Sequence, residues 1–284
     1  KVAPFAFLLA VLLTITYFAD VTLTAGQAAS AIWAQTWAGI VSALYIVGLI
    51  FFSFLILEMM KVSGAMDIVK NKIATISGDR RVQLILVGLF VPIFMEGAAG
   101  AGTPAAIAAP FMVGLGFDPI LAVVIALMSD GVCTSFGGAG LTTMSGSAQL
   151  VADGITTTVD TNFAAAGMFH MVGILVMPFL ILAMAYGKKG FKGKGIVGYA
   201  LYCGVVGALL MLLFSNYVGG FITDMGTGLG GIILAVLGLK IFKIETPEEL
   251  FYKVPESKEK PKFGFVRALS PYLFILLIFP VVLT

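Results

Sequence analysis

Two acidic side chains stand in glycine-rich stretches that interrupt long apolar sequence. Glu96 begins the first stretch (residues 96–104), and Asp130 lies in the second (residues 129–140). A carboxylate at membrane depth is costly, so it indicates a function by default. Burial disfavours the charged form of a carboxyl group, so either side chain could exchange a proton. Alternatively, Asp130 could hold Na⁺ with nearby oxygens, or the carboxylates could bond only the backbone of the breaks.

The breaks themselves indicate a binding site for an anion. Irregular backbone within a bilayer is tolerated only where protein or a wet cavity surrounds it, and secondary transporters use broken helices to bind substrates. The helix ends there offer free N–H groups and a partial positive charge. No Arg or Lys lies between Val82 and Gly187, so N–H and hydroxyl groups would have to hold an anion. The candidate substrate-binding residues are Gly97, Gly100, Gly102, Thr103, Thr134, Ser135 and Gly137, with Thr142 and Thr143 nearby, and the candidate ion-coupling residues are Glu96 and Asp130.

Other polar side chains give weaker indications. Thr103 precedes Pro104, a pattern typical of a hydroxyl that caps a helix start. His170 could relay protons or could be a packing residue. Asp224 is expected near an external helix end, in contact with water. The cysteines have no metal-ligand spacing, and no Walker motif is present, so the sequence predicts no metal, no cofactor, no ATP-driven transport and no nucleic-acid partner.

Composition explains where these residues must act. The 284 residues are 60% hydrophobic and 11% charged, whereas soluble domains are about half apolar and about a quarter charged. All seventeen basic residues lie at Lys1 or in three clusters, at residues 61–81, 188–194 and 240–267. The positive-inside rule assigns these clusters to the cytoplasm. The sequence therefore predicts a multi-pass protein of the inner membrane.

Apolar runs predict the helices that position the breaks. The runs are residues 3–18, 39–60, 82–95, 104–114, 119–129, 141–151, 163–186, 195–214, 228–242 and 266–284. Four runs between residues 82 and 151 are too short to span a bilayer alone. We expect the first two to form a re-entrant hairpin that turns at residues 96–103, and the last two to form one helix that is broken at residues 130–140.

The predicted fold is all-α and polytopic, and it divides at the charged segments. The expected parts are N-terminal transmembrane helices with an external interfacial segment (1–60), a cytoplasmic amphipathic segment (61–81), a transport core (82–151), three transmembrane helices (152–242), a cytoplasmic linker (243–265) and the start of a further helix (266–284). Because such linkers often join structural repeats, we interpret the chain as a fragment, one half of an inverted-repeat transporter.

The first break carries a specific motif. Residues 94–107 read FMEGAAGAGTPAAI, and VGLGF follows at residues 113–117. This pattern resembles the lactate permease family, as does the segment from Lys61 to Arg81. At the second break only Phe136 and Gly137 agree well with that family. The resemblance implies a bacterial proton symporter for lactate, glycolate or related 2-hydroxy acids, related to transporters with re-entrant hairpins, several of which are dimeric elevators.

The resulting hypothesis is a secondary active symporter for a small monocarboxylate, coupled to protons through Glu96 and embedded in the bilayer as a homodimer. One alternative is a carrier for a dicarboxylate or a gluconate-like acid, coupled to Na⁺. Another is a structural subunit of a membrane complex. A membrane enzyme would need His, Cys and carboxylates clustered at one membrane face, and the sequence indicates none.

Overall fold

The computed structural model describes residues 2–16, 24–100, 102–252, 263–268, 270–271 and 274, and all regular elements in these ranges are helices. The predicted all-α class is therefore confirmed. The chain divides into two units, Lys1–Phe52 and Ser53–Thr284. Most of the predicted final helix (266–284) and part of the predicted linker lie outside the described residues, as does Ala101 in the first break.

The first unit consists of α1 (Val2–Thr16) and the first part of α2 (Ala25–Val62). A capping box starts α2, because Thr24 N donates to Gln27 Oε1 at 2.9 Å and Gln27 N donates to Thr24 Oγ1 at 3.4 Å. From Ala25 onward, the predicted interfacial segment continues into the apolar run as one helix. Its alanine-rich sequence is a strong helix former, which explains this continuity.

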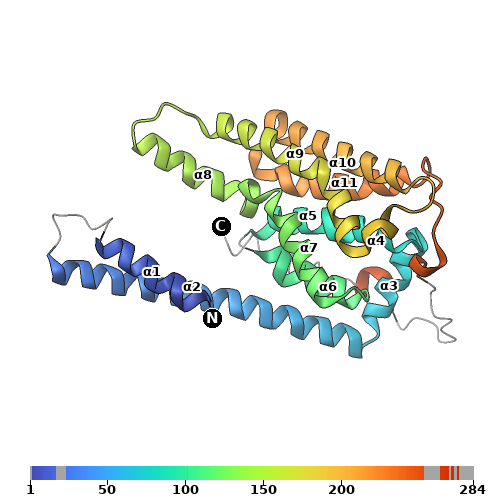
Figure 1. Cartoon of the computed structure of the whole chain (residues 1–284), viewed down its shortest axis with the longest axis horizontal. Coiled ribbons are helices and arrows are strands. Elements are labelled where there is room, and N and C mark those ends of the chain that lie inside the picture. Colours follow the sequence, from blue (N-terminus) through green and yellow to red (C-terminus); the bar gives the residue numbers. More distant parts are fainter. Residues whose placement is uncertain are drawn as a thin grey trace. The chain divides into compact units, whose positions relative to one another are not determined.

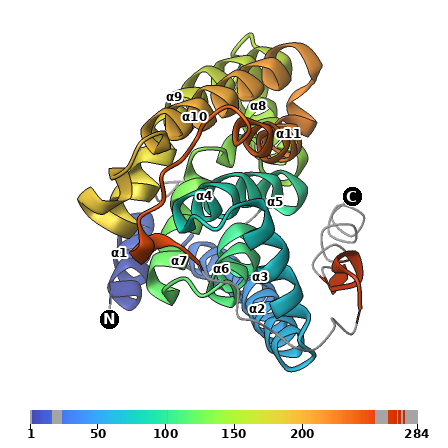
Figure 2. The same cartoon turned by 90° about the vertical axis from the view of Figure 1, so that its right-hand side faces the viewer.

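The second unit contains the remaining helices. They are α3 (Ala65–Ile76), α4 (Arg80–Ile85), the π-helical turn η1 (Leu86–Phe90), α5 (Val91–Ala99), the π-helical turn η2 (Pro104–Ala108), α6 (Ala109–Gly114), α7 (Pro119–Gly131), η3 (Thr134–Phe136), α8 (Gly137–Ala152), α9 (Val159–Tyr186), η4 (Gly187–Phe191), α10 (Ile196–Leu213), η5 (Phe214–Val218), η6 (Gly220–Ile222), α11 (Thr223–Gly238) and η7 (Glu248–Leu250). Helices α9, α10 and α11 lie alongside one another, and α5 lies beside α11 (Figures 1 and 2).

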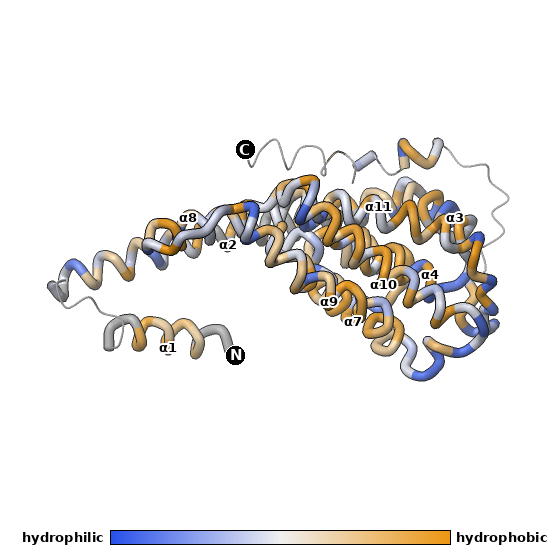
Figure 3. The backbone as a smooth tube through the Cα atoms, turned by 90° about the horizontal axis from the view of Figure 1, so that it is seen from above, coloured by the Kyte–Doolittle hydropathy of each residue, from blue (hydrophilic) through white to orange (hydrophobic). Residues whose placement is uncertain are grey.

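Several helices are long and apolar enough to cross a bilayer. In the part of the chain that the structure describes there are four, or five if the bent pair Pro119–Gly131 and Thr134–Ala152 counts as one span. That pair bends by 68°, as predicted for the broken helix. The protein is therefore a polytopic membrane protein. Hydrophilic segments gather at the end of the second unit where α3 and α4 lie (Figure 3).

The first arm of the predicted hairpin is longer than its apolar run. Residues Arg80–Ala98 form one helical segment of 19 residues, long enough to span a bilayer, whereas the sequence pattern predicts a half-helix over 82–95. The helix starts earlier because Asp79 accepts a hydrogen bond from Arg81 N at 2.8 Å. It ends later because the chain turns only at Gly100, which has φ 64°. Glu96 therefore lies within the last turns of a helix.

The turn that follows the second arm is held against the start of the first. Arg80 donates to the backbone oxygens of Leu115 and Gly116, both at 2.9 Å, and its guanidinium lies 3.9 Å from the centre of the Phe117 ring. Asp118 then caps α7 by accepting a hydrogen bond from Leu121 N at 2.9 Å. The two ends of the hairpin are thus fixed side by side.

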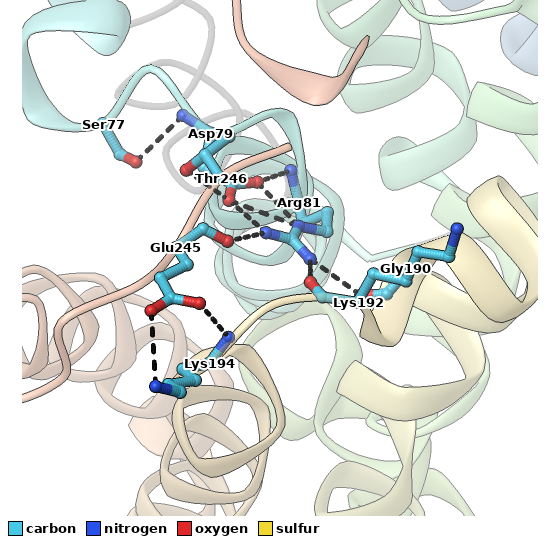
Figure 4. Close-up of polar contacts among 8 residues, drawn as sticks. All are labelled: Ser77, Asp79, Arg81, Gly190, Lys192, Lys194, Glu245 and Thr246. Carbon is cyan, nitrogen blue, oxygen red and sulfur yellow. Dashed lines mark hydrogen bonds and ion pairs between the residues drawn. The ribbon is translucent and has the colours of Figure 1, made fainter. Parts of the chain in front are cut away.

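A buried arginine joins three segments at the same end of the unit. Arg81 is fully buried and forms an ion pair with Asp79 at 2.6 Å (Figure 4). Its guanidinium also donates to backbone oxygens of Gly190, Lys192 and Glu245. These contacts tie the start of α4 to η4 and to the segment after α11. We call this group of contacts the Arg81 clamp.

Candidate transport site

The two glycine-rich breaks contact each other backbone to backbone. A Cβ atom on Gly100 would lie only 2.6 Å from the backbone nitrogen of Gly138, so no larger residue is accommodated at this crossing. Gly138, Ala139 and Gly140 all have positive φ, at 54°, 55° and 80°, which interrupts the helix directly after Gly137. An alanine in this left-handed region is strained by roughly 1–2 kcal/mol. Such strain indicates a functional role for the second break.

Glu96 lies at this crossing. A Cβ atom on Gly137 would overlap the Glu96 carboxyl oxygen Oε1 and would lie 3.0 Å from its Cδ. The backbone N–H of Gly102 is within hydrogen-bonding reach of the same carboxyl group. Glu96 is 3% exposed. The structure thus places this carboxyl group between the tip of the first break and the start of α8.

Asp130 approaches Glu96 from the end of α7. The adjacent Ser129 fixes α7 by donating to the backbone oxygen of Gly88 at 2.6 Å, inside the π-helical turn η1. Cys133 donates to the backbone oxygens of Ser129 at 3.4 Å and Asp130 at 3.3 Å. The carboxyl groups of Asp130 and Glu96 lie within hydrogen-bonding reach of each other.

A third carboxyl group joins this pair, and its predicted position was wrong. Asp224 is 1% exposed, not solvated, because α11 begins at Thr223 and not at residue 228. A Cβ atom on Gly97 would lie 2.5 Å from Asp224 Cβ, so this glycine lets the first turn of α11 approach α5 closely. Asp224 therefore faces Glu96 and Asp130.

Four of the six oxygens of these carboxyl groups lack the donors that ionised groups need. Oε2 of Glu96, Oδ1 of Asp130 and both carboxyl oxygens of Asp224 are buried without a hydrogen-bond partner among the described residues. A carboxylate only accepts hydrogen bonds, so two facing carboxyl groups can bond each other only when one is protonated. Two like charges about 4 Å apart repel by about 4 kcal/mol at an effective dielectric constant of about 20. A fully ionised cluster would therefore be unfavourable without a proton or another cation beside it.

The hydroxyl side chains of the second break shape its backbone. Thr142 donates to the backbone oxygens of Thr134 at 3.0 Å and Ser135 at 2.8 Å, and Thr143 donates to that of Ser135 at 2.6 Å. The Ser135 hydroxyl lies 2.7 Å from Nε2 of His170, so this histidine supports the break. Thr134 is exposed and Ser135 is partly exposed.

The role predicted for Thr103 as a helix cap was wrong. Its backbone is helical and its side chain makes no capping bond, because the hydroxyl donates to the backbone oxygen of Gly100. This bond closes the tip of the first break. Of the predicted residues there, Gly102 is partly exposed, whereas Gly97, Gly100 and Thr103 are buried. In the described ranges, no set of three His, Cys, Asp or Glu side chains is arranged to hold a metal ion.

The comparison with known proteins agrees with the motif at the first break. The family model described as L-lactate permease matches residues 2–284. The chain belongs to the L-lactate permease family. The resemblance inferred from the sequence is thereby confirmed, and the family it belongs to is one of permeases and not of enzymes.

Individual relatives are named as permeases. The glycolate permease GlcA of Escherichia coli K12 is 31% identical over 188 residues, which are 66% of this chain and 32% of the relative. An L-lactate permease of Halalkalibacterium halodurans is 29% identical over 243 residues, or 85% of this chain and 46% of the relative. An L-lactate permease of Bacillus subtilis is 31% identical over 186 residues. The chain thus spans about a third to a half of these relatives, and no solved structure matches it.

Proposed function

We propose that this family member transports a small monocarboxylate such as L-lactate or glycolate across the bacterial inner membrane, together with protons. The observation that best supports this proposal is the contact between the two breaks, which brings Glu96 and Asp130 against backbone that can receive an anion. The printed names of the relatives support the choice of substrate. The resemblance to the family leads us to propose a homodimer and an inverted repeat as well.

The predicted site residues divide into two groups by exposure. We assign contact with the substrate to Gly102, Thr134 and Ser135, which are exposed or partly exposed. The buried residues shape the backbone around it, and they are Gly97, Gly100, Thr103 and Gly137. In this scheme the substrate carboxylate binds to backbone N–H and hydroxyl groups, as at other helix ends.

The carboxyl groups couple the anion to protons in the proposed mechanism. An ionised Glu96 or Asp130 would repel a substrate anion beside it. Uptake of a proton by the Glu96–Asp130 pair reduces this repulsion, so the anion binds better to the protonated site, and release of that proton on the other side favours release of the anion. Binding that depends on protonation in this way couples the movement of the anion to that of the proton.

Uptake by proteoliposomes tests this function. The purified protein should accumulate labelled L-lactate or glycolate when a proton gradient is imposed, and a protonophore should abolish accumulation. Uptake that requires a sodium gradient, or that dicarboxylates and gluconate inhibit more strongly than lactate, would instead support the alternative carriers. An absence of uptake of all these acids would contradict the proposal.

A single methyl group at position 137 should disrupt the site. Gly137 has φ −59°, which alanine adopts readily, so Gly137→Ala changes only the space that the Glu96 carboxyl group occupies. We expect the uptake rate to fall by roughly tenfold to a hundredfold, because displacement of about 1 Å in a functional site has such effects. Initial rates in proteoliposomes, normalised to protein content, measure the loss.

The matched control is Gly146→Ala in the same helix. A Cβ atom there would have no neighbour within 4 Å, and alanine is a better helix former than glycine. This variant should transport at the normal rate. Equal rates for the two variants would contradict the proposed role of the contact between Gly137 and Glu96.

A further inference from the structure

Asp224 and Thr227 form a polar pair that the coupling mechanism at Glu96 does not use. They lie one turn apart on α11, so their side chains share one face of the helix. Asp224 is 1% exposed and Thr227 is fully buried. Both carboxyl oxygens of Asp224 and Oγ1 of Thr227 have no hydrogen-bond partner among the described residues. A buried polar pair without partners indicates a ligand that is taken up and released.

The groups that face Asp224 come from several elements. Glu96 on α5 and Asp130 at the end of α7 contribute negative charge, and the nearby Cys133 thiol donates to backbone oxygens instead of to Asp224. His170 on α9 is engaged with Ser135. None of the groups that act on Asp224 is basic. An ionised Asp224 would thus lie in an apolar interior among other acids, without a counter-charge.

The pair Glu96–Asp130 cannot supply what Asp224 lacks. A proton shared by those two carboxyl groups lets them bond each other, and it leaves Asp224 without a proton of its own. A second proton is needed on Asp224 to make it neutral, and the resulting O–H group can then donate to an acceptor such as the Thr227 hydroxyl. Asp224 lies this close to the other acids because Gly97 has no side chain that would keep α11 away from α5.

We propose that Asp224 and Thr227 form a second proton-binding site beside Glu96 and Asp130, and that both sites exchange a proton in each transport cycle. This inference rests on the proposed function, because it concerns the number of protons that accompany the substrate. Two protons and one monocarboxylate anion carry a net charge of +1 across the membrane, whereas one proton and one anion carry none. The second site therefore makes transport electrogenic.

The membrane potential separates the two stoichiometries. In proteoliposomes with equal pH on both sides, a potassium diffusion potential that is negative inside should drive accumulation of labelled L-lactate by the wild-type protein. Asp224→Asn should abolish this response while a pH gradient still drives uptake. The control Asp153→Asn, at an exposed position after α8, should respond to both gradients as the wild type does.

Each outcome decides the inference. If the membrane potential does not drive uptake by the wild-type protein, the proposed second proton site is overturned, whatever the result for Asp224→Asn. Potential-driven uptake that persists in Asp224→Asn also overturns it. If the potential drives uptake only in the presence of Na⁺, the second site binds a sodium ion and the proton assignment fails.

A second measurement does not depend on transport. Infrared spectra of the purified protein at neutral pH should contain the C=O band of protonated carboxyl groups, and Asp224→Asn should reduce this band. An unchanged band overturns the second proton site. If Asp224→Asn reduces the band but the wild-type protein transports none of the tested acids, the second proton site is supported and the proposed function is contradicted. The failure of the inference and the failure of the proposed function are therefore distinguishable.

Discussion

Glu96→Gln should abolish proton-driven accumulation of the substrate. Glutamine keeps the shape of the side chain beside Gly137 but cannot release a proton, so the coupling step is lost. We expect uptake driven by a pH gradient to fall by a factor on the order of a hundred or more. The variant should insert and melt like the wild type, because it removes one charge from a crowded acidic cluster.

Glu58→Gln is the matched control. Glu58 lies on α2 at an exposed position, where it pairs with Lys61 at 2.6 Å. Exposed pairs of this kind contribute little to stability, and this one is not part of the candidate site. Full uptake by Glu58→Gln beside lost uptake by Glu96→Gln supports the assignment. Normal proton-driven uptake by Glu96→Gln would refute it.

Arg81→Met should cause the largest loss of stability. The substitution leaves Asp79 as a buried charge without its partner and removes donors from three backbone oxygens. Breaking a buried ion pair from one side typically costs about 3–5 kcal/mol. For a chain of this size, we expect the melting temperature in detergent to fall by roughly 10 °C. Thermal unfolding of the purified variant measures the change.

Two further variants test the cause of that loss. Asp79→Asn combined with Arg81→Met should be less destabilised than Arg81→Met alone, because no unpaired charge remains. Lys189→Met removes an exposed ion pair with Glu249, whose pKa is lowered by its hydrogen bond to Lys189 and by the charge of that residue. Solvent screens this pair, so the melting temperature should barely change. A similar fall in both single variants would argue against the Arg81 clamp.

Much of the fold follows from local sequence. Apolar runs predict helices because every backbone polar group in a bilayer must be bonded within its own segment. The runs at residues 163–186 and 195–214 correspond to α9 and α10, and the 68° bend lies where the second glycine-rich stretch predicts it. The candidate carboxylates Glu96 and Asp130 were also identifiable, since each interrupts apolar sequence.

Asp224 illustrates what local sequence does not predict. Its surroundings are polar and glycine-rich, so they resemble a loop, whereas in the fold the first turn of α11 packs against Gly97 of another helix. A weak signal was nevertheless present. Asp224, Thr227, Gly228 and Gly231 share one helical face, and small residues at such spacing indicate close packing of helices in membranes.

The Arg81 clamp shows a second kind of limit. The sequence places Arg81 in a basic cluster, and such clusters are usually solvated. The acceptors that bury it come from residues 190–192 and 245, which are more than a hundred positions away. Charge patterns predict the side of the membrane, whereas only the folded chain determines which cation is enclosed.

The glycines between α5 and α11 determine how the protein can move. A Cβ atom on Gly228 would lie 2.5 Å from the backbone nitrogen of Phe94, so the two backbones are in direct contact with no side chain between them. If one helix slid along the other, larger side chains would replace the glycines at these contacts and would clash with the facing backbone. We therefore expect α5 and α11 to move as one rigid body during transport. A disulfide that joins the two helices should then leave uptake intact. Loss of uptake would show that they separate.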